Sequence, residues 1–349
     1  MAPLPSQFQN SPWYPQITGA GLARTSVGKV REGYSAPAYP DNLLVLATDR
    51  VSIYNFVLPA LVPRKGEVLT AISHFMMTHL LSDFRHDMIV PECGPESEAI
   101  WGDWHQRHPD FPWGRCTIVR KFEVRPYEII FRRHIGGSVW NEYLQTQTVA
   151  GIRLRDGLRK WERLPEALFT PTDKSEDDDP ISVERFYAQT TTGDHEAVKM
   201  LRAAYDRAYA HLEERGILIL DTKFEYALDD RDQPVLVDEK LTPDSSRFVD
   251  EGDWLDSLAT GRDPAFRDKQ RVRRWGQTVK TPFRDAESQP IVGIHKLKGS
   301  NPDHIAFVHG LVVPQELLDE TSGIYLRLFE DVTGCDLDTY QRDAMRIAG

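Results

Sequence analysis

The chain has 349 residues, of which 40% are hydrophobic, so it can bury a sizeable core in one large domain or in two packed lobes. Its formal net charge of −11 argues against a surface that binds nucleic acid or an anionic membrane. Small anionic ligands must then be bound by local clusters of basic side chains.

The three cysteines, Cys93, Cys116 and Cys335, lie far apart and form no CxxC motif, so the sequence indicates neither a disulfide framework nor a zinc site. The segment MAPLPSQFQNSPWYPQ lacks the basic and apolar regions of a signal peptide, and no run of about 18 apolar residues occurs. We therefore expect a cytoplasmic protein without membrane contacts. The sequence does not indicate its oligomeric state.

The first basic segment is GKVREGY, Gly28 to Tyr34, which we expect to be a strand. A turn at Pro40 to Asn42 would follow, and then a second strand from Leu43 to Thr48. Alternation along the first strand would place Lys29 and Arg31 on one face, where they could bind a polyphosphate. The P-loop pattern GxxxxGK[ST] is absent, and two basic residues on a strand are a weak signal by themselves.

Apolar residues at helical spacing predict a packing helix that begins at Glu67. They are Leu69, Ile72, Met76 and Leu80. Residues 91–114 are rich in Pro, Trp and acidic side chains, and we expect them to form an inserted surface loop. A strand containing Lys121 is predicted to follow, from Cys116 to Val124.

The next segment, RPYEIIFRRHIGGSVWNEY, contains Arg132, Gly137 and Ser138. A guanidinium offers a planar fork of donors, and glycine lets backbone amides approach a ligand, so these residues could cradle a phosphate. Taken alone, an arginine and a Gly-Gly-Ser turn are more often purely structural.

Ile217 to Phe248 is predicted to be a hairpin that carries charged residues on strands that otherwise resemble core. Asp221, Lys223 and Glu225 share one face of the first strand, because successive side chains of a strand point to opposite faces. After a polar turn, the second strand ends at Asp238. A solvated ladder of ion pairs is the alternative, but the apolar run that precedes these residues favours a functional site.

The motifs DTKFEY and VDEKLTPDSSRF, in order after GKVR and KGEVLT, resemble those of the phosphoribosylaminoimidazole-succinocarboxamide synthase (SAICAR synthetase) family, over about Gly28 to Gly334. The resemblance implies a two-lobed α+β fold. An N-terminal antiparallel β lobe, residues 1–125, would cover ATP, and a larger α+β lobe, residues 126–349, would hold the substrate and metal site. Insertions would lie at about 91–114 and 276–310.

The resemblance also implies a ligase that uses ATP and Mg²⁺ to join the carboxylate of a carboxyaminoimidazole ribotide to the amine of L-aspartate in purine biosynthesis. A carboxylate is a poor acyl donor, so ATP must first convert it to an acyl phosphate. The enzyme then needs cations and a metal ion rather than its own nucleophile. Lys223 would stabilise charge on the transferring phosphoryl group, and Asp221 would orient Lys223 or accept a proton from the attacking ammonium.

The remaining roles implied by the resemblance concern ligand binding. ATP would be bound by Gly28, Lys29, Arg31, Lys121 and Glu225. Glu225 and Asp238 would hold Mg²⁺, which prefers carboxylate oxygens. The ribotide, with its 5′-phosphate, and the amino acid would be bound by Ser52, Asn55, Arg132, Gly137, Ser138, Lys223 and Arg247.

The chain departs from the family pattern at several positions. Asn55 replaces Asp, Arg133-His134 replaces Gly-Tyr, Gly136 replaces Thr, and Asp178 stands where the family has His. These departures motivate an alternative, a related ligase of a specialised nucleoside or natural-product pathway with a different heterocyclic acid or amine. A remote alternative is a non-catalytic nucleotide-binding regulator, against which the complete charge set of the hairpin argues.

Overall fold

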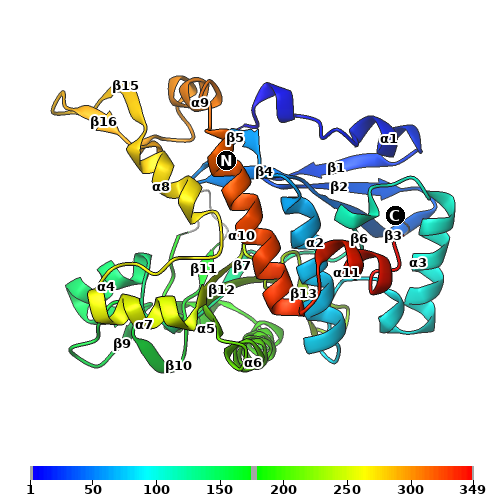
Figure 1. Cartoon of the computed structure of the whole chain (residues 1–349). Coiled ribbons are helices and arrows are strands. Elements are labelled where there is room, and N and C mark those ends of the chain that lie inside the picture. The colour runs from blue at the N-terminus through cyan, green and yellow to red at the C-terminus, as the bar shows by residue number, and fades with distance from the viewer. Residues whose placement is uncertain (1–2, 174–178, 348–349) are drawn as a thin grey trace.

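The computed structural model describes residues 3–173 and 179–347. Two antiparallel sheets stand at different levels of the molecule, with helices between and around them, so helices and sheets are mixed as the α+β prediction requires (Figure 1). The predicted lobe boundary at residue 125 falls in the connection between these sheets. Within the described ranges, no helix is long and apolar enough to cross a membrane.

The N-terminal sheet has the order β1-β2-β3-β6. Its strands are β1 Ala23–Val27, β2 Arg31–Ala36, β3 Tyr39–Ala47 and β6 Cys116–Arg120. A short helix, α1 (Tyr14–Gly19), precedes the sheet, and a separate hairpin, β4 Arg50–Ile53 and β5 Phe56–Leu61, follows β3.

The predicted strand from Gly28 to Tyr34 is wrong in its first half. The Gly28 amide donates to the Arg31 carbonyl (2.8 Å), which closes a tight turn between β1 and β2. Lys29 lies in this turn and does not share a strand face with Arg31. The turn expected at Pro40 to Asn42 is also displaced, since β3 already begins at Tyr39.

The predicted surface loop over residues 91–114 is wrong as well. Residues Pro95–Arg107 form helix α3, preceded by a 3-10 turn at Pro91–Cys93 and followed by another at Trp113–Arg115. Trp104 of α3 is fully buried and stacks on Tyr39, with ring centroids 4.3 Å apart. The tryptophans of this segment therefore supply core packing. The strand after it ends at Arg120, short of the predicted Val124.

The C-terminal sheet has the order β10-β7-β12-β13, with β11 on β7 and β14 on β12. Its strands are β7 Tyr127–His134, β10 Arg163–Phe169, β11 Thr172–Asp173, β12 Ile217–Leu228, β13 Pro234–Val237 and β14 Ser246–Asp250. A small hairpin, β8 Thr148–Val149 and β9 Ile152–Arg153, lies outside it. The hairpin predicted around Asp221 is confirmed, with Glu225 opposite Val237.

Helices connect and cover the sheets. They include α2 Lys65–Phe75, which continues as a π turn over Met76–Leu80, α4 Ser138–Thr146, α5 Val183–Gln189, α6 Thr192–Glu213, α7 Glu251–Thr260, α10 Gln315–Thr333 and α11 Leu337–Asp343. Thr191 is the N-cap of α6, and Asp194 completes a capping box with it.

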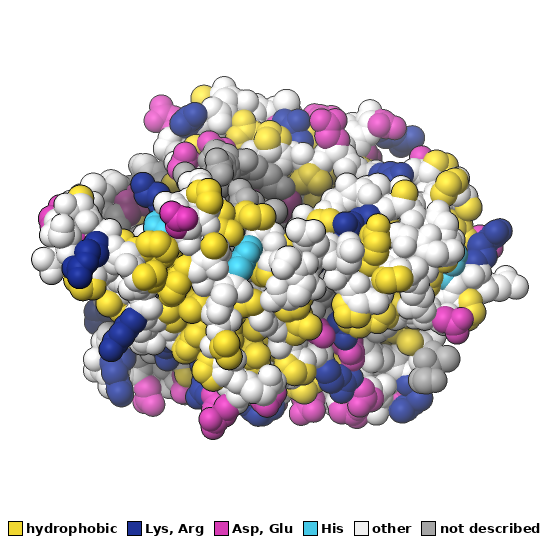
Figure 2. Space-filling view, turned by 90° about the horizontal axis from the view of Figure 1, so that it is seen from above, with side chains coloured by type: hydrophobic (Ala, Val, Ile, Leu, Met, Phe, Trp, Pro, Cys, Tyr) yellow, Lys and Arg dark blue, Asp and Glu magenta, His cyan; other side chains and the backbone are white. Residues whose placement is uncertain are grey.

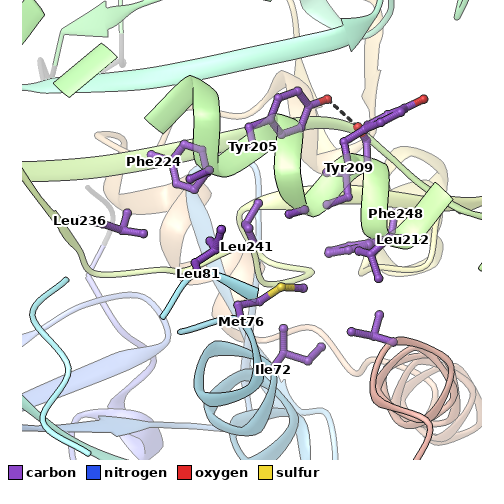
Figure 3. Close-up of a cluster of buried hydrophobic side chains, with 14 of the residues drawn as sticks. Ile72, Met76, Leu81, Tyr205, Tyr209, Leu212, Phe224, Leu236, Leu241 and Phe248 are labelled. Atoms are coloured by element: carbon purple, nitrogen blue, oxygen red, sulfur yellow. Dashed lines mark hydrogen bonds between the residues drawn. The ribbon is translucent and has the colours of Figure 1, made fainter. Parts of the chain in front are cut away.

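The largest hydrophobic core joins α2 to α6, α10 and the C-terminal sheet. Ile72 and Met76 of the α2 segment point toward side chains of α6, β12 and β14 (Figure 3). Helix α10 packs on α2 from another side. The amphipathic helix predicted from residue 67 is therefore confirmed as a packing element, and it fixes one lobe on the other.

Residues 276–310 are ordered rather than an open loop. After α8 (Gln270–Thr278) come the hairpin β15 Lys280–Arg284 and β16 Pro290–Val292, a 3-10 turn at Ile294–Lys296, and α9 Pro302–His309. This segment shares a second apolar core with β4 and β5. In the view from above, hydrophobic side chains gather on the face turned toward the viewer (Figure 2).

Candidate active site

A cavity of about 190 Å³ lies beside the central hairpin, where β7, β12, the β13–β14 connection and the start of α8 meet. Its lining residues are Ile130, Arg132, Asp221, Thr222, Lys223, Pro243, Asp244, Ser245, Ser246, Arg247, Asp268, Lys269 and Arg273. The structure thus brings together four predicted site residues that are up to 115 positions apart in the chain, since 247 − 132 = 115.

Positive charge predominates in this cavity. Five cationic side chains and three aspartates line it, so their formal sum is 5 − 3 = +2, whereas the whole chain carries −11. Such a cavity attracts a small anion. Lys269 and Arg273 were not predicted as site residues.

Arg132 and Arg247 converge on one carboxylate. Oδ2 of Asp221 accepts from Nη1 of Arg132 at 2.7 Å and also from Nη1 of Arg247. Nε of Arg132 donates to Oγ1 of Thr170 at 3.0 Å, which fixes the guanidinium plane. Asp221 therefore orients two arginines. The predicted roles of Asp221, orienting Lys223 or accepting a proton from the attacking ammonium, stay predictions.

Two glycines make room for this arrangement. Gly137 has φ +64°, and a Cβ there would lie 3.2 Å from Nη1 of Arg247. At Gly136, a Cβ would approach the Trp161 ring to 2.1 Å, so the indole requires glycine at this position. Ser138 is exposed at the first position of α4, directly after these glycines.

Lys223 is paired with a residue that the sequence analysis missed. Its Nζ lies 2.5 Å from Oε1 of Glu128 and 3.9 Å from Oε1 of Glu225. Burial alone would lower the pKa of Lys223, but Glu128 and Glu225 outweigh it and raise the pKa. Alternation along β7 places Glu128 and Arg132 on one face, so this periodicity could have identified Glu128.

Asp238 directly follows β13 and forms an ion pair with Arg31, the first residue of β2, with Nη1 to Oδ1 at 2.7 Å. Desolvation would raise the pKa of Asp238, but Arg31 and Lys240 outweigh it and lower the pKa. Asp238 adopts φ +56°, and Nζ of Lys240 holds its carbonyl at 2.7 Å while pairing with Asp87. This backbone conformation is uncommon for a non-glycine residue and is held in place by buried charge.

A smaller cavity, of about 40 Å³, adjoins this ion pair. Its walls combine apolar residues of the N-terminal sheet and α2 with charged residues from both parts of the chain. The lining residues are Arg31, Val45, Ala47, Leu69, Thr70, Ser73, Asp87, Met88, Thr117, Val119, Asp238 and Lys240. Apolar walls with a few polar groups are typical of small-molecule sites.

Glu225 and Asp238 fit the donor set that an Mg²⁺ ion bound to ATP requires. Among residues 3–173 and 179–347, no group of three or more His, Cys, Asp or Glu side chains could hold a metal ion. Mg²⁺ that arrives with a nucleotide needs only one or two carboxylates, because phosphates and waters complete its shell. Lys223 acts electrostatically on both carboxylates, so the three charges share one small region.

Asp244 sits at the inner wall of the larger cavity and binds three donors. They are Nζ of Lys65 at 2.5 Å, the hydroxyl of Tyr325 at 2.8 Å and Nζ of Lys269 at 3.3 Å. Burial would raise the pKa of Asp244, but Lys269 and Lys65 hold it well below its usual range. These buried contacts connect α2, α10 and the start of α8 to the inner wall of the larger cavity. The cluster was not predicted.

Eight of the predicted site residues line neither cavity: Gly28, Lys29, Ser52, Asn55, Lys121, Gly137, Ser138 and Glu225. Lys121 is exposed beyond β6 and donates to the Pro40 carbonyl at 2.5 Å. Ser52 is buried in β4, and Asn55 is exposed at the β4–β5 turn. Their assigned roles stay predictions.

Arg133, His134 and Gly136, three of the departures from the family pattern, have local packing explanations, and nothing in the structure explains Asn55. Arg133 pairs with Asp206 of α6 at 2.6 Å, and His134 lies between the Trp161 carbonyl and the Tyr209 hydroxyl. Neither residue lines the cleft. Asp178 lies outside the described residues.

Known proteins resemble this chain along most of its length. The profile of the SAICAR synthetase family matches residues 24–290. The phosphoribosylaminoimidazole-succinocarboxamide synthase of Schizosaccharomyces pombe is 32% identical over 330 residues, covering 90% of this chain and 95% of that protein. Its counterpart from Corynebacterium efficiens is 34% identical over 321 residues, with 90% and 92% covered.

Solved structures agree with these relatives. The SAICAR synthase of Saccharomyces cerevisiae, complexed with SAICAR, superposes with a TM-score of 0.71 at 29% identity and covers 90% of this chain and 96% of that one. A SAICAR synthetase in complex with ADP has a TM-score of 0.58 at 16% identity and shares the fold.

Proposed function

The chain belongs to the SAICAR synthetase family and is an ATP-dependent ligase of purine biosynthesis. From this premise we propose which ligands each of its two cavities binds. The larger cavity binds carboxyaminoimidazole ribotide and L-aspartate, and the smaller one receives the nucleotide. The observation that carries this assignment is the position of Lys223, which lines the larger cavity and interacts electrostatically with Asp238 at the edge of the smaller one.

The nucleotide would place its base against the apolar walls around Val45 and Leu69 and its phosphates toward Arg31. Arg31 is charged at neutral pH, because Glu239 and Asp238 raise its pKa despite burial. Glu225 and Asp238 would hold Mg²⁺, which draws electron density from the phosphoryl oxygens when bound. Lys29, in the turn next to Arg31, adds a second cation.

The reaction needs two transfers. The ribotide carboxylate attacks the γ-phosphorus of ATP, ADP leaves, and an acyl phosphate forms. The amine of aspartate then attacks the acyl carbon, a proton leaves the nitrogen, and inorganic phosphate departs as the amide forms. Lys223 would stabilise negative charge on the oxygens of the transferring group, as preorganised cations do in phosphoryl transfer.

The acid substrate would be held by its 5′-phosphate between Arg132 and Arg247, close to the backbone of Gly137. Nη1 of each guanidinium binds Asp221, and a guanidinium carries further donors that a phosphate could accept. The retained arginine pair and the packing reasons found for Arg133 and His134 favour the ordinary purine-pathway pair of substrates.

The phosphate assignment is tested by comparing the ribotide with its dephosphorylated nucleoside. Arg247→Ala should weaken binding of the ribotide by roughly 1.5–3 kcal/mol, the cost of one charge-assisted contact, while binding of ATP changes little. Equal activity on the nucleoside and the nucleotide would show that these arginines do not bind a phosphate.

A further inference from the structure

The turn that carries Lys29 and Arg31 accepts hydrogen bonds from the buried side chain of Arg50. Nη2 of Arg50, the first residue of β4, donates to the carbonyls of Gly28 (3.3 Å) and Arg31 (3.4 Å). The carbonyl of Val30, between them, accepts from the backbone amide and the hydroxyl of Thr48, each at 2.8 Å. The inner carbonyls of the turn are therefore tied to the segment that leads into β4.

Arg50 is itself fixed from the opposite side. Its side chain is 2% exposed and forms an ion pair with Glu32, which is 0% exposed, with Nη1 to Oε1 at 3.0 Å. Nη1 also donates to the Phe8 carbonyl at 3.0 Å. Oε2 of Glu32 accepts from the Ser11 hydroxyl at 3.0 Å, so the N-terminal segment closes over this pair.

A buried ion pair is weak evidence of stabilisation, since the cost of desolvating two charges offsets their attraction. What distinguishes Arg50 is the direction of Nη2, which donates to two backbone carbonyls of the turn while Nη1 is held by Glu32 and Phe8. The planar guanidinium therefore specifies the shape of that turn. A lysine would keep the charge but could not bridge these acceptors.

We propose that Arg50 is a positioning residue for the nucleotide: through its contacts with the Gly28–Arg31 turn it sets the places of Lys29 and Arg31 relative to the phosphates. This inference rests on the proposed function and deepens it. Arg50 does not line either cleft cavity, so its effect on ATP is indirect.

The test is the affinity for Mg-ADP and the KM for each substrate in Arg50→Lys. We expect the Kd for Mg-ADP and the KM for ATP to rise by about tenfold, the size of one lost hydrogen bond to a charged group, with the KM of the ribotide and of aspartate within twofold of wild type. Arg115→Lys is the matched control. Arg115 is a buried arginine of the same lobe that pairs with Asp49 and Glu67 and makes no contact with the turn.

Arg115→Lys should lower the thermal midpoint without changing the affinity for Mg-ADP. If Arg50→Lys fails to fold, Ser11→Ala provides a milder change that loosens Glu32, and a roughly threefold weaker affinity is expected, less than one full hydrogen bond. An unchanged affinity for Mg-ADP in the folded variant overturns the proposal, and so does an equal rise in all three KM values.

Arg31→Ala separates this inference from the assignment on which it rests. If Arg31→Ala leaves the affinity for Mg-ADP unchanged, the turn does not bind phosphates and the nucleotide site is misplaced. If Arg31→Ala weakens binding and Arg50→Lys does not, only the role of Arg50 is wrong.

Discussion

At the scale of single residues, the site consists of charges that are already paired before a ligand arrives. Asp221 holds two arginines, Glu128 holds Lys223, and Asp238 holds Arg31. Each cation therefore has a fixed direction and needs little reorganisation when negative charge develops in its vicinity.

Lys223→Ala tests the catalytic assignment. We expect kcat to fall by about two decades, as is usual when one preorganised electrostatic group is removed, with the thermal midpoint nearly unchanged. Lys199→Ala, at an exposed lysine of α6, is the control and should behave as wild type. Turnover of Lys223→Ala close to that of wild type would remove Lys223 from the active centre.

At the scale of elements, the sequence predicted β12 and β13 because a strand has a simple signature: apolar and charged residues alternate around Asp221, and a polar turn follows. It did not predict α3, because prolines and acidic residues outweighed the tryptophans in composition. It also missed Glu128, which the periodicity of β7 could have identified, and Asp244; their pairing with Lys223 and Lys65 spans 95 and 179 positions. Contacts across such separations depend on the fold.

Trp104→Ala tests whether α3 is a packed element. Loss of a fully buried indole should cost about 3–5 kcal/mol of unfolding free energy, measured with urea. Trp104→Phe, which keeps an aromatic ring near Tyr39, should cost less. The KM values of the folded enzyme should be unaffected, because α3 lies on the far side of the N-terminal sheet from the cleft residues. A change below about 1 kcal/mol, typical of a surface site, would contradict this packing.

At the scale of the whole molecule, one core spans both lobes, and it encloses titratable groups. Burial lowers the pKa of His74 on α2 to about 4 and that of His134 on β7 to about 3, from an ordinary value near 6.5. In the unfolded chain these histidines bind protons below about pH 6.5, whereas the folded chain binds them only near pH 4 and pH 3. Acid therefore favours the unfolded chain across this window.

The free energy of unfolding should accordingly decrease as the pH falls from about 6.5 toward 4, and the contribution of these histidines should be constant above pH 7. His134→Gln removes one titrating group, so between pH 5.5 and 4.5 its slope should be smaller than that of wild type by about 1.4 kcal/mol per pH unit, the value for one proton. Identical slopes would mean that His134 is protonated in the folded protein.

The central claim, that this cleft joins the carboxylate of carboxyaminoimidazole ribotide to the amine of L-aspartate, is tested most directly by steady-state ADP release at saturating Mg-ATP. With this pair of substrates we predict a kcat/KM of at least about 10⁴ M⁻¹s⁻¹, the low end for a working enzyme, and no ADP release above background when either substrate is omitted. A value far below this, together with faster turnover of another heterocyclic acid or another amine, would contradict the account.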